Sequence, residues 1–242
     1  MLIQNKYELI DKIGAGGFSN VYKAKHHSKD TFVAIKFDYD ENSKILIQNE
    51  INIYLSLFKK ETTNIINIKS FGILDKRNYI VMDYIPCNLE NYVMRGKEME
   101  SFTHEYVFQK LVFVVEKLHD CGYVHRDLKP DNILVKNEEI CLIDLGFSTK
   151  ISDKIYNKGI GSILFSSYNT HLSKYQYQKK DDILSCFYIV CHLFCKKSLP
   201  WHNLKCDLNY KSKILYHMKK YTDFKKYYKD KMISNIFKNI SP

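Results

Sequence analysis

One segment of eight residues constrains this chain more than any other: it reads His125-Arg126-Asp127-Leu128-Lys129-Pro130-Asp131-Asn132. Asp127 can accept a proton from an attacking hydroxyl and direct that hydroxyl at phosphorus. Lys129 can reach a transferring phosphoryl group and neutralise its charge, and Asn132 offers a neutral oxygen to a metal ion. This combination predicts chemistry at a phosphate and disfavours a purely structural loop.

A second acidic group follows at a short interval. Asp144 lies in Ile143-Asp144-Leu145-Gly146, directly after a short apolar stretch and twelve residues beyond Asn132. A hard cation such as Mg²⁺ takes few protein ligands when nucleotide phosphates complete its shell. The spacing therefore makes Asn132 and Asp144 the candidate metal ligands.

The N-terminal part supplies a candidate phosphate-binding loop. Ile13-Gly14-Ala15-Gly16-Gly17-Phe18-Ser19-Asn20-Val21 has the pattern of strand, turn and strand. Glycines let backbone N–H groups approach phosphate oxygens closely. An ordinary hairpin is the alternative for this loop alone, because Ser19 stands where G-x-G-x-x-G has its third glycine. In Val33-Ala34-Ile35-Lys36, further on, we expect Lys36 to hold the α- and β-phosphates, with Glu50 on the next helix to orient it.

Length and periodicity give the fold class. The 242 residues, 45% of them hydrophobic, suffice for one large domain with a substantial core. Apolar periodicity predicts strands over 7–13, 20–25, 31–37, 66–74, 78–83, 133–135 and 140–143. It predicts helices over 43–58, 88–95, 105–121 and 183–195. We expect an α+β protein, with a small β-rich part that has one helix and a larger, mainly helical part.

Taken in chain order, the glycine-rich loop, the segment with Lys36, the segment 125–132 and the segment with Asp144 resemble the signature set of eukaryotic-type protein kinases. The resemblance extends from residue 7 to about residue 201. The resemblance implies the bilobal protein-kinase fold as a single domain over 1–242, with an N-lobe of about 1–82, a hinge at 83–86 and a C-lobe of 87–242. It implies ATP between the lobes, Mg²⁺, and in-line transfer of the γ-phosphate to a protein hydroxyl. Lys129 after Asp127 resembles the serine/threonine branch.

The resemblance also implies roles for particular residues. Asp127 and Lys129 would be catalytic, and Asn132 and Asp144 would bind the metal. Met82 would be the gatekeeper, while Asp83 and Ile85 would offer hinge backbone to adenine. The implied nucleotide-binding set is Ile13, Gly14, Gly16, Val21, Ala34, Lys36, Glu50, Met82, Asp83, Ile85, Asn132 and Asp144.

Three later segments resemble the casein kinase I family, whose members read roughly G-T-x-x-Y-x-S-x-N-T-H-L, R-R-D-D-L and S-L-P-W. Here they are residues 161–172, Lys179-Lys180-Asp181-Asp182 and Ser198-Leu199-Pro200-Trp201. The resemblance implies that Asp182 anchors the catalytic loop. The chain is identified as a divergent, shortened member, because the stretch from 144 to 161 is short, Leu164 stands where an arginine is common, and the chain stops at residue 242.

Two other classes stay open. The shortened segments are consistent with a pseudokinase or scaffold that binds nucleotide or partners without efficient phosphoryl transfer. A small-molecule kinase of the same fold is the third reading, although the N-T-H-L and S-L-P-W segments favour a protein kinase.

The charge of the chain is concentrated near its end. Of a net charge of +10, residues 196–242 carry +9, from 12 Lys and three Asp. A solvated helix face explains this charge, since Phe224, Tyr228, Met232 and Ile236 recur every four residues and Tyr221, Ile233 and Phe237 lie near that stripe. Attraction of acidic substrates and a nucleic-acid patch are the alternatives. The lysines concerned include Lys219, Lys220, Lys225, Lys226, Lys229 and Lys231.

Location and partners follow from what the sequence contains. The longest apolar stretch, 183–195, is 13 residues long, whereas a bilayer needs about 20. Seven cysteines with no C-x-x-C pair indicate a reducing compartment. We expect a cytoplasmic or nuclear monomer that acts on protein substrates, acidic ones among them, with no membrane or nucleic-acid partner.

Overall fold

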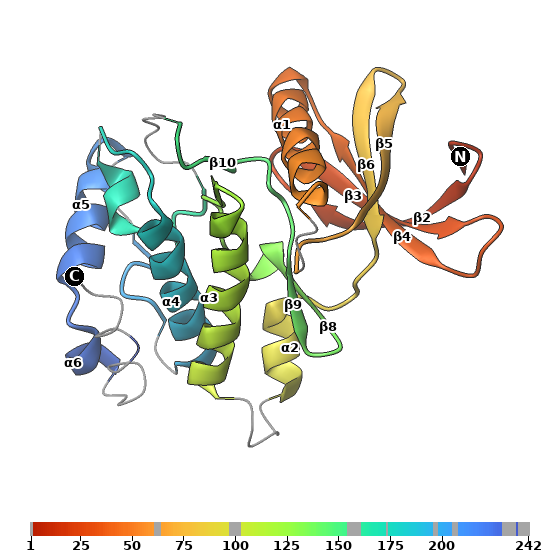
Figure 1. Ribbon diagram of the computed structural model, residues 1–242. Helices are drawn as coiled ribbons and strands as arrows, with labels where there is room; N and C mark the ends of the chain where they lie inside the picture. Colours follow the sequence, from red (N-terminus) through yellow and green to blue (C-terminus); the bar gives the residue numbers. More distant parts are fainter. Residues whose placement is uncertain are drawn as a thin grey trace. The chain divides into compact units, whose positions relative to one another are not determined.

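The computed structural model describes residues 2–60, 64–96, 103–153, 161–172, 174–195, 198–204, 208–228 and 236. The chain forms two compact units, one of residues 1–86 with 143–147 and one of residues 87–142 with 148–242. Strands dominate the first unit and helices the second, as the colours of Figure 1 show along the chain. The predicted α+β class is confirmed.

The first unit is built on an antiparallel sheet of order β1-β2-β3-β4-β6-β5. Its strands are β1 (Leu2–Ile3), β2 (Tyr7–Ala15), β3 (Ser19–His26), β4 (Phe32–Asp38), β5 (Ile68–Leu74) and β6 (Arg77–Asp83). Five of the six correspond to predicted strands, with ends moved by one or two residues. Strand β1 was not predicted, because two residues are too few to show a period of two.

Helix α1 (Glu41–Phe58) packs on β4 and β6. It begins two residues before the predicted start because Asp40 caps it. The Asp40 carboxylate accepts from the Ser43 N–H at 2.8 Å, and the Ser43 hydroxyl oxygen accepts from the Asp40 N–H at 2.6 Å. This reciprocal pair satisfies two backbone donors at the end of the helix.

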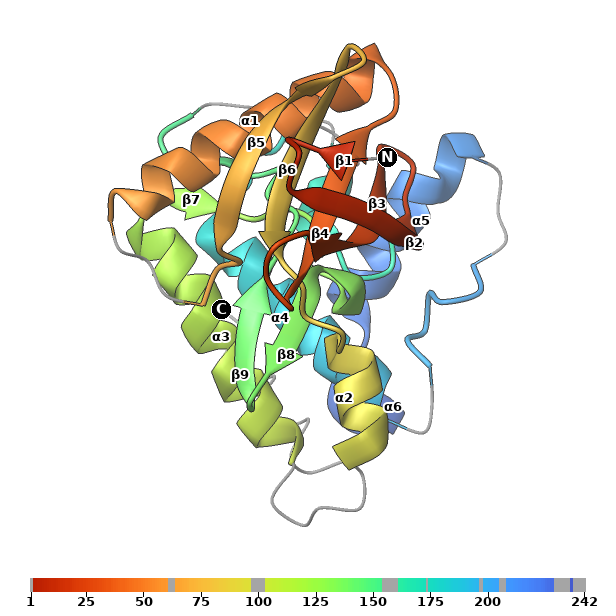
Figure 2. The same cartoon turned by 90° about the vertical axis from the view of Figure 1, so that its right-hand side faces the viewer.

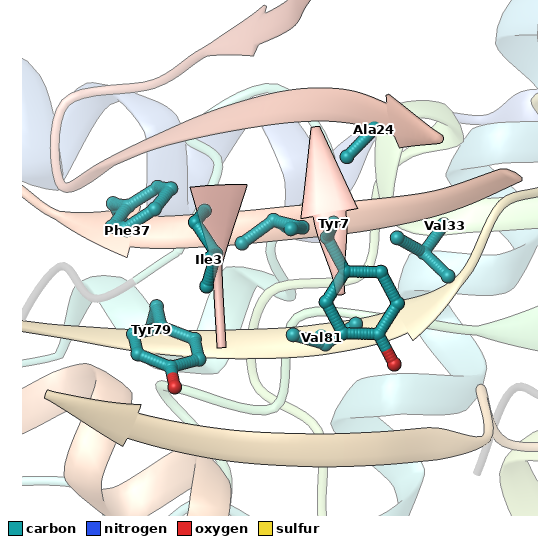
Figure 3. Close-up of a cluster of buried hydrophobic side chains, with 8 residues drawn as sticks. Ile3, Tyr7, Ala24, Val33, Phe37, Tyr79 and Val81 are labelled. Atoms are coloured by element: carbon teal, nitrogen blue, oxygen red, sulfur yellow. The ribbon is translucent and has the colours of Figure 1, made fainter. Parts of the chain in front are cut away.

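The N-terminal hairpin covers the opposite face of the sheet. Gln4 and Asn5 adopt left-handed backbone angles in the turn, and Ile3 pairs with Tyr7. Strand alternation places Ile35 and Phe37 on the face away from Lys36. The cluster on that face, shown in Figure 3, consists of Ile3, Tyr7, Ala24, Val33, Ile35, Phe37, Tyr79 and Val81. Figure 2 shows β1 and β2 in front of β4 and β6, with α1 behind.

The second unit has a core of helices. Helix α3 (His104–Asp120) packs against α4 (Lys179–Phe194), which is buried on nearly all sides. Around them lie α2 (Leu89–Gly96), α5 (Leu208–Tyr221), α6 (Phe224–Tyr228), the 3₁₀ turns η1 (Pro130–Asn132) and η2 (Tyr168–His171), and the strands β7 (Tyr123–Val124), β8 (Ile133–Lys136), β9 (Glu139–Leu142) and β10 (Thr149–Lys150). The predicted core helix at 183–195 is confirmed as α4. None of the helices in the described residues is both long enough and apolar enough to cross a bilayer.

The Lys-rich C-terminal region departs from the prediction of a solvated face at two places. Lys219 is only 2% exposed, and Tyr221, expected near the apolar stripe, is 67% exposed. Phe224 and Ile236 are buried, as the stripe requires. The side chains of Lys225 and Tyr228, and residues Lys229, Lys231, Met232, Ile233 and Phe237, lie outside the described part of the chain.

The hairpin cover gives a stability prediction. Ile3→Ala removes a fully buried side chain from the cluster in Figure 3 and should lower the free energy of unfolding by about 2–4 kcal/mol. Leu2→Ala on the same strand is the control, since Leu2 is 47% exposed and should change it by less than about 0.5 kcal/mol. Urea unfolding followed by circular dichroism measures both. Equal effects of the two substitutions would contradict the packing role of the hairpin.

Candidate active site

Lys36 is the centre of a charged cluster in the first unit. Strand β4 places its side chain toward α1, where Nζ donates to Glu50 Oε2 at 2.7 Å. A second bond of 2.7 Å runs from Nζ to Asp144 Oδ1. The Lys36 and Glu50 side chains are 8% and 0% exposed, whereas that of Asp144 is 33% exposed. The structure thus brings together three residues that lie far apart in the sequence.

Burial and charge act in opposite directions on these groups. Burial lowers the pKa of Lys36, but Asp144 and Glu50 outweigh it and raise that pKa above its ordinary value. For Glu50, burial raises the pKa, Lys36 opposes this and Asp144 adds to it. Two carboxylates therefore face one ammonium, and the more exposed of the two is Asp144.

Residues 143–147 are held on helix α1. The Asn49 side-chain amide donates to the Gly146 carbonyl at 2.8 Å. Leu145 is fully buried, and Asp144 has a left-handed backbone angle of φ 61°. The Phe147 ring packs edge-on against Phe18 of the glycine-rich turn, with centroids 5.5 Å apart. Neither the left-handed angle nor the ring contact has a signal in the sequence.

The glycine-rich turn joins β2 to β3. Gly14 pairs with Val21, and the Gly16 N–H donates to the Ser19 carbonyl at 2.9 Å. A Cβ on Gly17 would meet nothing within 4 Å, and one on Gly16 would meet only the Ser19 carbonyl oxygen, at 4.0 Å. Packing within the chain does not require these two glycines. Ser19, at the third glycine position, belongs to β3.

The residues predicted to contact adenine lie on adjacent strands. Ala34 of β4 is opposite Met82 of β6, and both are buried. The Asp83 N–H donates to the Asn67 carbonyl at 3.1 Å, and its carboxylate pairs with Lys69 at 2.6 Å. The Asp83 N–H and carboxylate thus both have partners within the chain. Ile85 is half-buried two residues later, and Ile13 of β2 is 46% exposed.

In the second unit, Asp127 lies among donors. Its Oδ2 accepts from Lys129 Nζ at 3.0 Å and from Asn132 Nδ2 at 3.2 Å. Its Oδ1 accepts from the Ser162 N–H at 2.7 Å. Asn132 Nδ2 also donates to the Asp127 carbonyl at 2.8 Å, so Oδ1 is the Asn132 atom that could serve a cation. Of the three predicted residues of this loop, Lys129 and Asn132 thus both contact Asp127.

A buried carboxylate of α4 fixes the start of the same loop. Asp182 accepts from the N–H groups of His125 at 2.8 Å and Arg126 at 3.1 Å. Its other partners are His119 Nε2 and the Tyr177 hydroxyl, both at 2.8 Å. Burial opposes the charge of Asp182, but the hydrogen bonds outweigh it and lower its pKa. The bonds hold Arg126 in a left-handed conformation of φ 73°.

Sequence reasoning missed the contribution of residues 161 and 162. Gly161 has φ 87°, and a Cβ there would lie 2.3 Å from the Arg126 carbonyl oxygen, so the position requires glycine. The next N–H, of Ser162, is the one that holds Asp127. Only the position of Gly161 at the start of the segment 161–172 could have indicated this. His119 and Tyr177 have no comparable signal.

The family model of the protein kinase domain matches residues 7–241. The chain belongs to the protein kinase domain family. A kinase domain uses ATP, typically with a divalent metal ion, and transfers a phosphoryl group.

The residues of this kinase domain fit such a ligand. Gly16 and Gly17 leave open space beside their backbone, where phosphate oxygens would fit. The excess of carboxylate over ammonium around Lys36 suits a hard cation at the half-buried Asp144. Among the described residues, no cluster of three or more His, Cys, Asp or Glu could hold a metal.

The Asp182 network of the kinase domain gives a prediction at neutral pH. Asp182→Asn places an amide N–H against backbone donors and removes a buried charge that four groups stabilise. It should lower the free energy of unfolding by about 3–5 kcal/mol. Asp131→Asn, an exposed carboxylate of the same loop, is the control and should have little effect. Urea unfolding of each protein near pH 7 measures the difference.

The same pair of variants has an expected pH dependence. An aspartate with a lowered folded-state pKa stabilises the fold fully above its unfolded-state pKa of about 3.9, and the stabilisation is lost as pH falls below that value. The difference in free energy of unfolding between the natural protein and Asp182→Asn should thus stay constant from about pH 7 to 5. It should shrink between about pH 4 and 3. A difference that grows on acidification would show that the pKa of Asp182 is raised.

Proposed function

We propose that this kinase domain is an active serine/threonine protein kinase of casein kinase I type, which transfers the γ-phosphate of ATP to protein hydroxyls. The observation that carries the proposal is the contact of Lys129 with Asp127 at 3.0 Å, in a loop where Asn132 touches the same carboxylate. A lysine two residues after the aspartate is typical of the serine/threonine branch. The carboxylate is 4% exposed and is held at both oxygens.

The residues of the second unit would act directly on the substrate hydroxyl. Asp127 would accept the hydroxyl proton, and the Ser162 N–H, which donates to its Oδ1, would hold the carboxylate in place. Lys129, which donates to Oδ2, would move its ammonium toward the transferring phosphoryl group and neutralise charge there. Asn132 keeps the carboxylate oriented through Nδ2 and would offer Oδ1 to the metal.

The first unit would bind the nucleotide. When bound, ATP with Mg²⁺ supplies the phosphoryl group and a cation that offsets its charge. Lys36, oriented by Glu50, would hold the α- and β-phosphates, and Asp144 would bind the cation. The nucleotide contacts proposed besides these are Ile13, Gly14, Gly16, Val21, Ala34, Met82, Asp83 and Ile85.

The casein kinase I type is supported by bonds between the segments that carry the resemblance. Asp181 accepts from the Ser167 hydroxyl at 2.6 Å and from Asn169 Nδ2 at 3.1 Å. Trp201 Nε1 donates to the Leu164 carbonyl at 2.8 Å. Residues 161–172, the Asp-Asp pair and the S-L-P-W segment therefore form one connected assembly. Segments that are bonded to one another in the fold support the assignment to the casein kinase I type more strongly than three unconnected sequence similarities would.

Protein substrates, acidic ones among them, are the partners that we propose. The chain carries a net charge of +10, and Lys179 and Lys180 are exposed at the start of α4. A positive surface raises the local concentration of acidic substrates.

The experiment is transfer of radiolabel from ATP with Mg²⁺ to casein and to serine peptides with acidic or neutral flanks. Asp127→Asn should lower kcat by about 100-fold or more, because a positioned general base contributes about 10²–10⁴ to a rate. Asp131→Asn should leave kcat within about twofold. Phosphoamino acid analysis of the product should show phosphoserine or phosphothreonine.

A nucleotide-binding measurement separates the proposal from its main alternative. ATP with Mg²⁺ should raise the melting temperature of both the natural protein and Asp127→Asn, since ligand binding stabilises the folded state. Stabilisation by the nucleotide without transfer above the Asp127→Asn level would show a pseudokinase. Absence of both stabilisation and transfer would show a scaffold.

A further inference from the structure

Lys219 is a buried lysine with no carboxylate partner among the residues that the structure describes. It lies near the end of α5 and is 2% exposed. Its Nζ donates to the Ile163 carbonyl at 2.6 Å, to the Ser166 carbonyl at 2.5 Å and to the Ser166 hydroxyl at 3.3 Å. An amphipathic helix normally directs a lysine in its last turn to solvent, where the charge interacts with the helix dipole. The burial of Lys219 is therefore unusual for a lysine in this position of a helix.

Burial and the acceptors around Nζ act in opposite directions on the charge of Lys219. Burial lowers the pKa of Lys219 well below its ordinary value. Three oxygen acceptors nevertheless surround Nζ, and only the protonated amine has three N–H donors. The rings of Tyr188 and Trp201 lie 5.6 and 5.3 Å from Nζ, and their faces also attract a cation.

Lys219 and Trp201 hold the same short segment. Trp201 Nε1 donates to the Leu164 carbonyl at 2.8 Å, between the two carbonyls that Lys219 binds. The Ser162 carbonyl accepts from the N–H groups of Phe165 and Ser166, which closes the segment into a turn. Side chains from α5 and from the loop before it thus bind three of the four backbone carbonyls of residues 163–166, those of Ile163, Leu164 and Ser166.

This segment begins at the N–H that holds Asp127. Ser162 donates to Asp127 Oδ1 at 2.7 Å, and Gly161 packs its backbone against the Arg126 carbonyl. A shift of residues 163–166 would therefore be felt at the Asp127 carboxylate. Small displacements of a reacting group reduce rates strongly, by about 10²-fold for 1 Å.

We propose that Lys219, together with Trp201, is a positioning residue that fixes the segment 162–166 and, through the Ser162 N–H, the Asp127 carboxylate. The inference rests on the proposed kinase function. It assigns the ordering of this segment to the hydrogen bonds of a buried lysine. Lys219 touches neither substrate nor nucleotide in this role.

The test compares Lys219→Met, which keeps the volume but removes the donors, with Lys220→Met. Lys220 is the next residue of the same helix and is exposed, and the partners that the structure describes for it, the Tyr216 hydroxyl and the rings of Tyr216 and Tyr221, all lie on α5 itself. A serine peptide with neutral flanks excludes effects of the lost surface charge. Lys219→Met should lower kcat by about 10- to 100-fold, with KM for ATP unchanged, and Lys220→Met should change neither. Equal kcat in the two variants would overturn the proposal.

Hydrogen–deuterium exchange provides a readout that does not depend on catalysis. The amides of Ser162, Phe165 and Ser166 are hydrogen-bonded, so a peptide covering 161–172 should exchange faster in Lys219→Met and not in Lys220→Met. If the natural protein transfers no phosphate, the proposed function fails, and exchange still decides the role of Lys219. Unchanged exchange in Lys219→Met would overturn that role.

Two further variants separate positioning from space filling. Lys219→Arg keeps the charge and donors but adds bulk, so positioning predicts a higher kcat for Lys219→Arg than for Lys219→Met, and space filling predicts the reverse. Trp201→Phe removes the donor to Leu164 and keeps an aromatic ring. Should Lys219→Met fail to fold, unchanged exchange over 161–172 in Trp201→Phe would overturn the proposal.

Discussion

The loop that carries Asp127 depends on the buried carboxylate of Asp182. This carboxylate replaces water as the acceptor for two consecutive backbone N–H groups, of His125 and Arg126, at the point where the chain takes a left-handed conformation. Without that acceptor, two buried donors and a strained residue would be left together, and each is unfavourable by itself. The position of Asp127, the next residue, follows from this bond.

Two neighbouring aspartates of α4 organise two different segments. Successive residues of a helix point about 100° apart, so adjacent side chains can reach different parts of the chain. Asp182 holds the loop that starts at His125, whereas Asp181 holds Ser167 and Asn169 of the following segment. Residues 163–166, which precede Ser167, are bound by Lys219 and Trp201. The buried helix α4 thus connects the groups around Asp127 with the segment that contains Ser167 and Asn169.

Sequence patterns predicted much of this site and missed its supports. Asp127, Lys129 and Asn132 lie within six residues, so their contact needs little more than a turn, and the predicted pairing of Lys36 with a helix-borne acid required only helical and strand periods. Ser162, His119 and Tyr177 were not found. Ser162 contributes a backbone N–H to Asp127, and His119 and Tyr177 contribute a ring nitrogen and a hydroxyl to Asp182. Periodicity carries no information on such tertiary contacts.

The sequence alone determined the class of fold, the order of the longer helices and strands up to α4 and the residue types at the site, because these follow from local periods, turn chemistry and short spacings. Tertiary structure alone decided which charges are buried and what they touch. Lys219 shows the difference: its sequence position in the last turn of a helix indicates solvent, yet neighbouring carbonyls from a segment more than fifty residues earlier surround it. Desolvating a charge becomes tolerable only where acceptors from other parts of the chain converge, and that convergence exists only in the folded state.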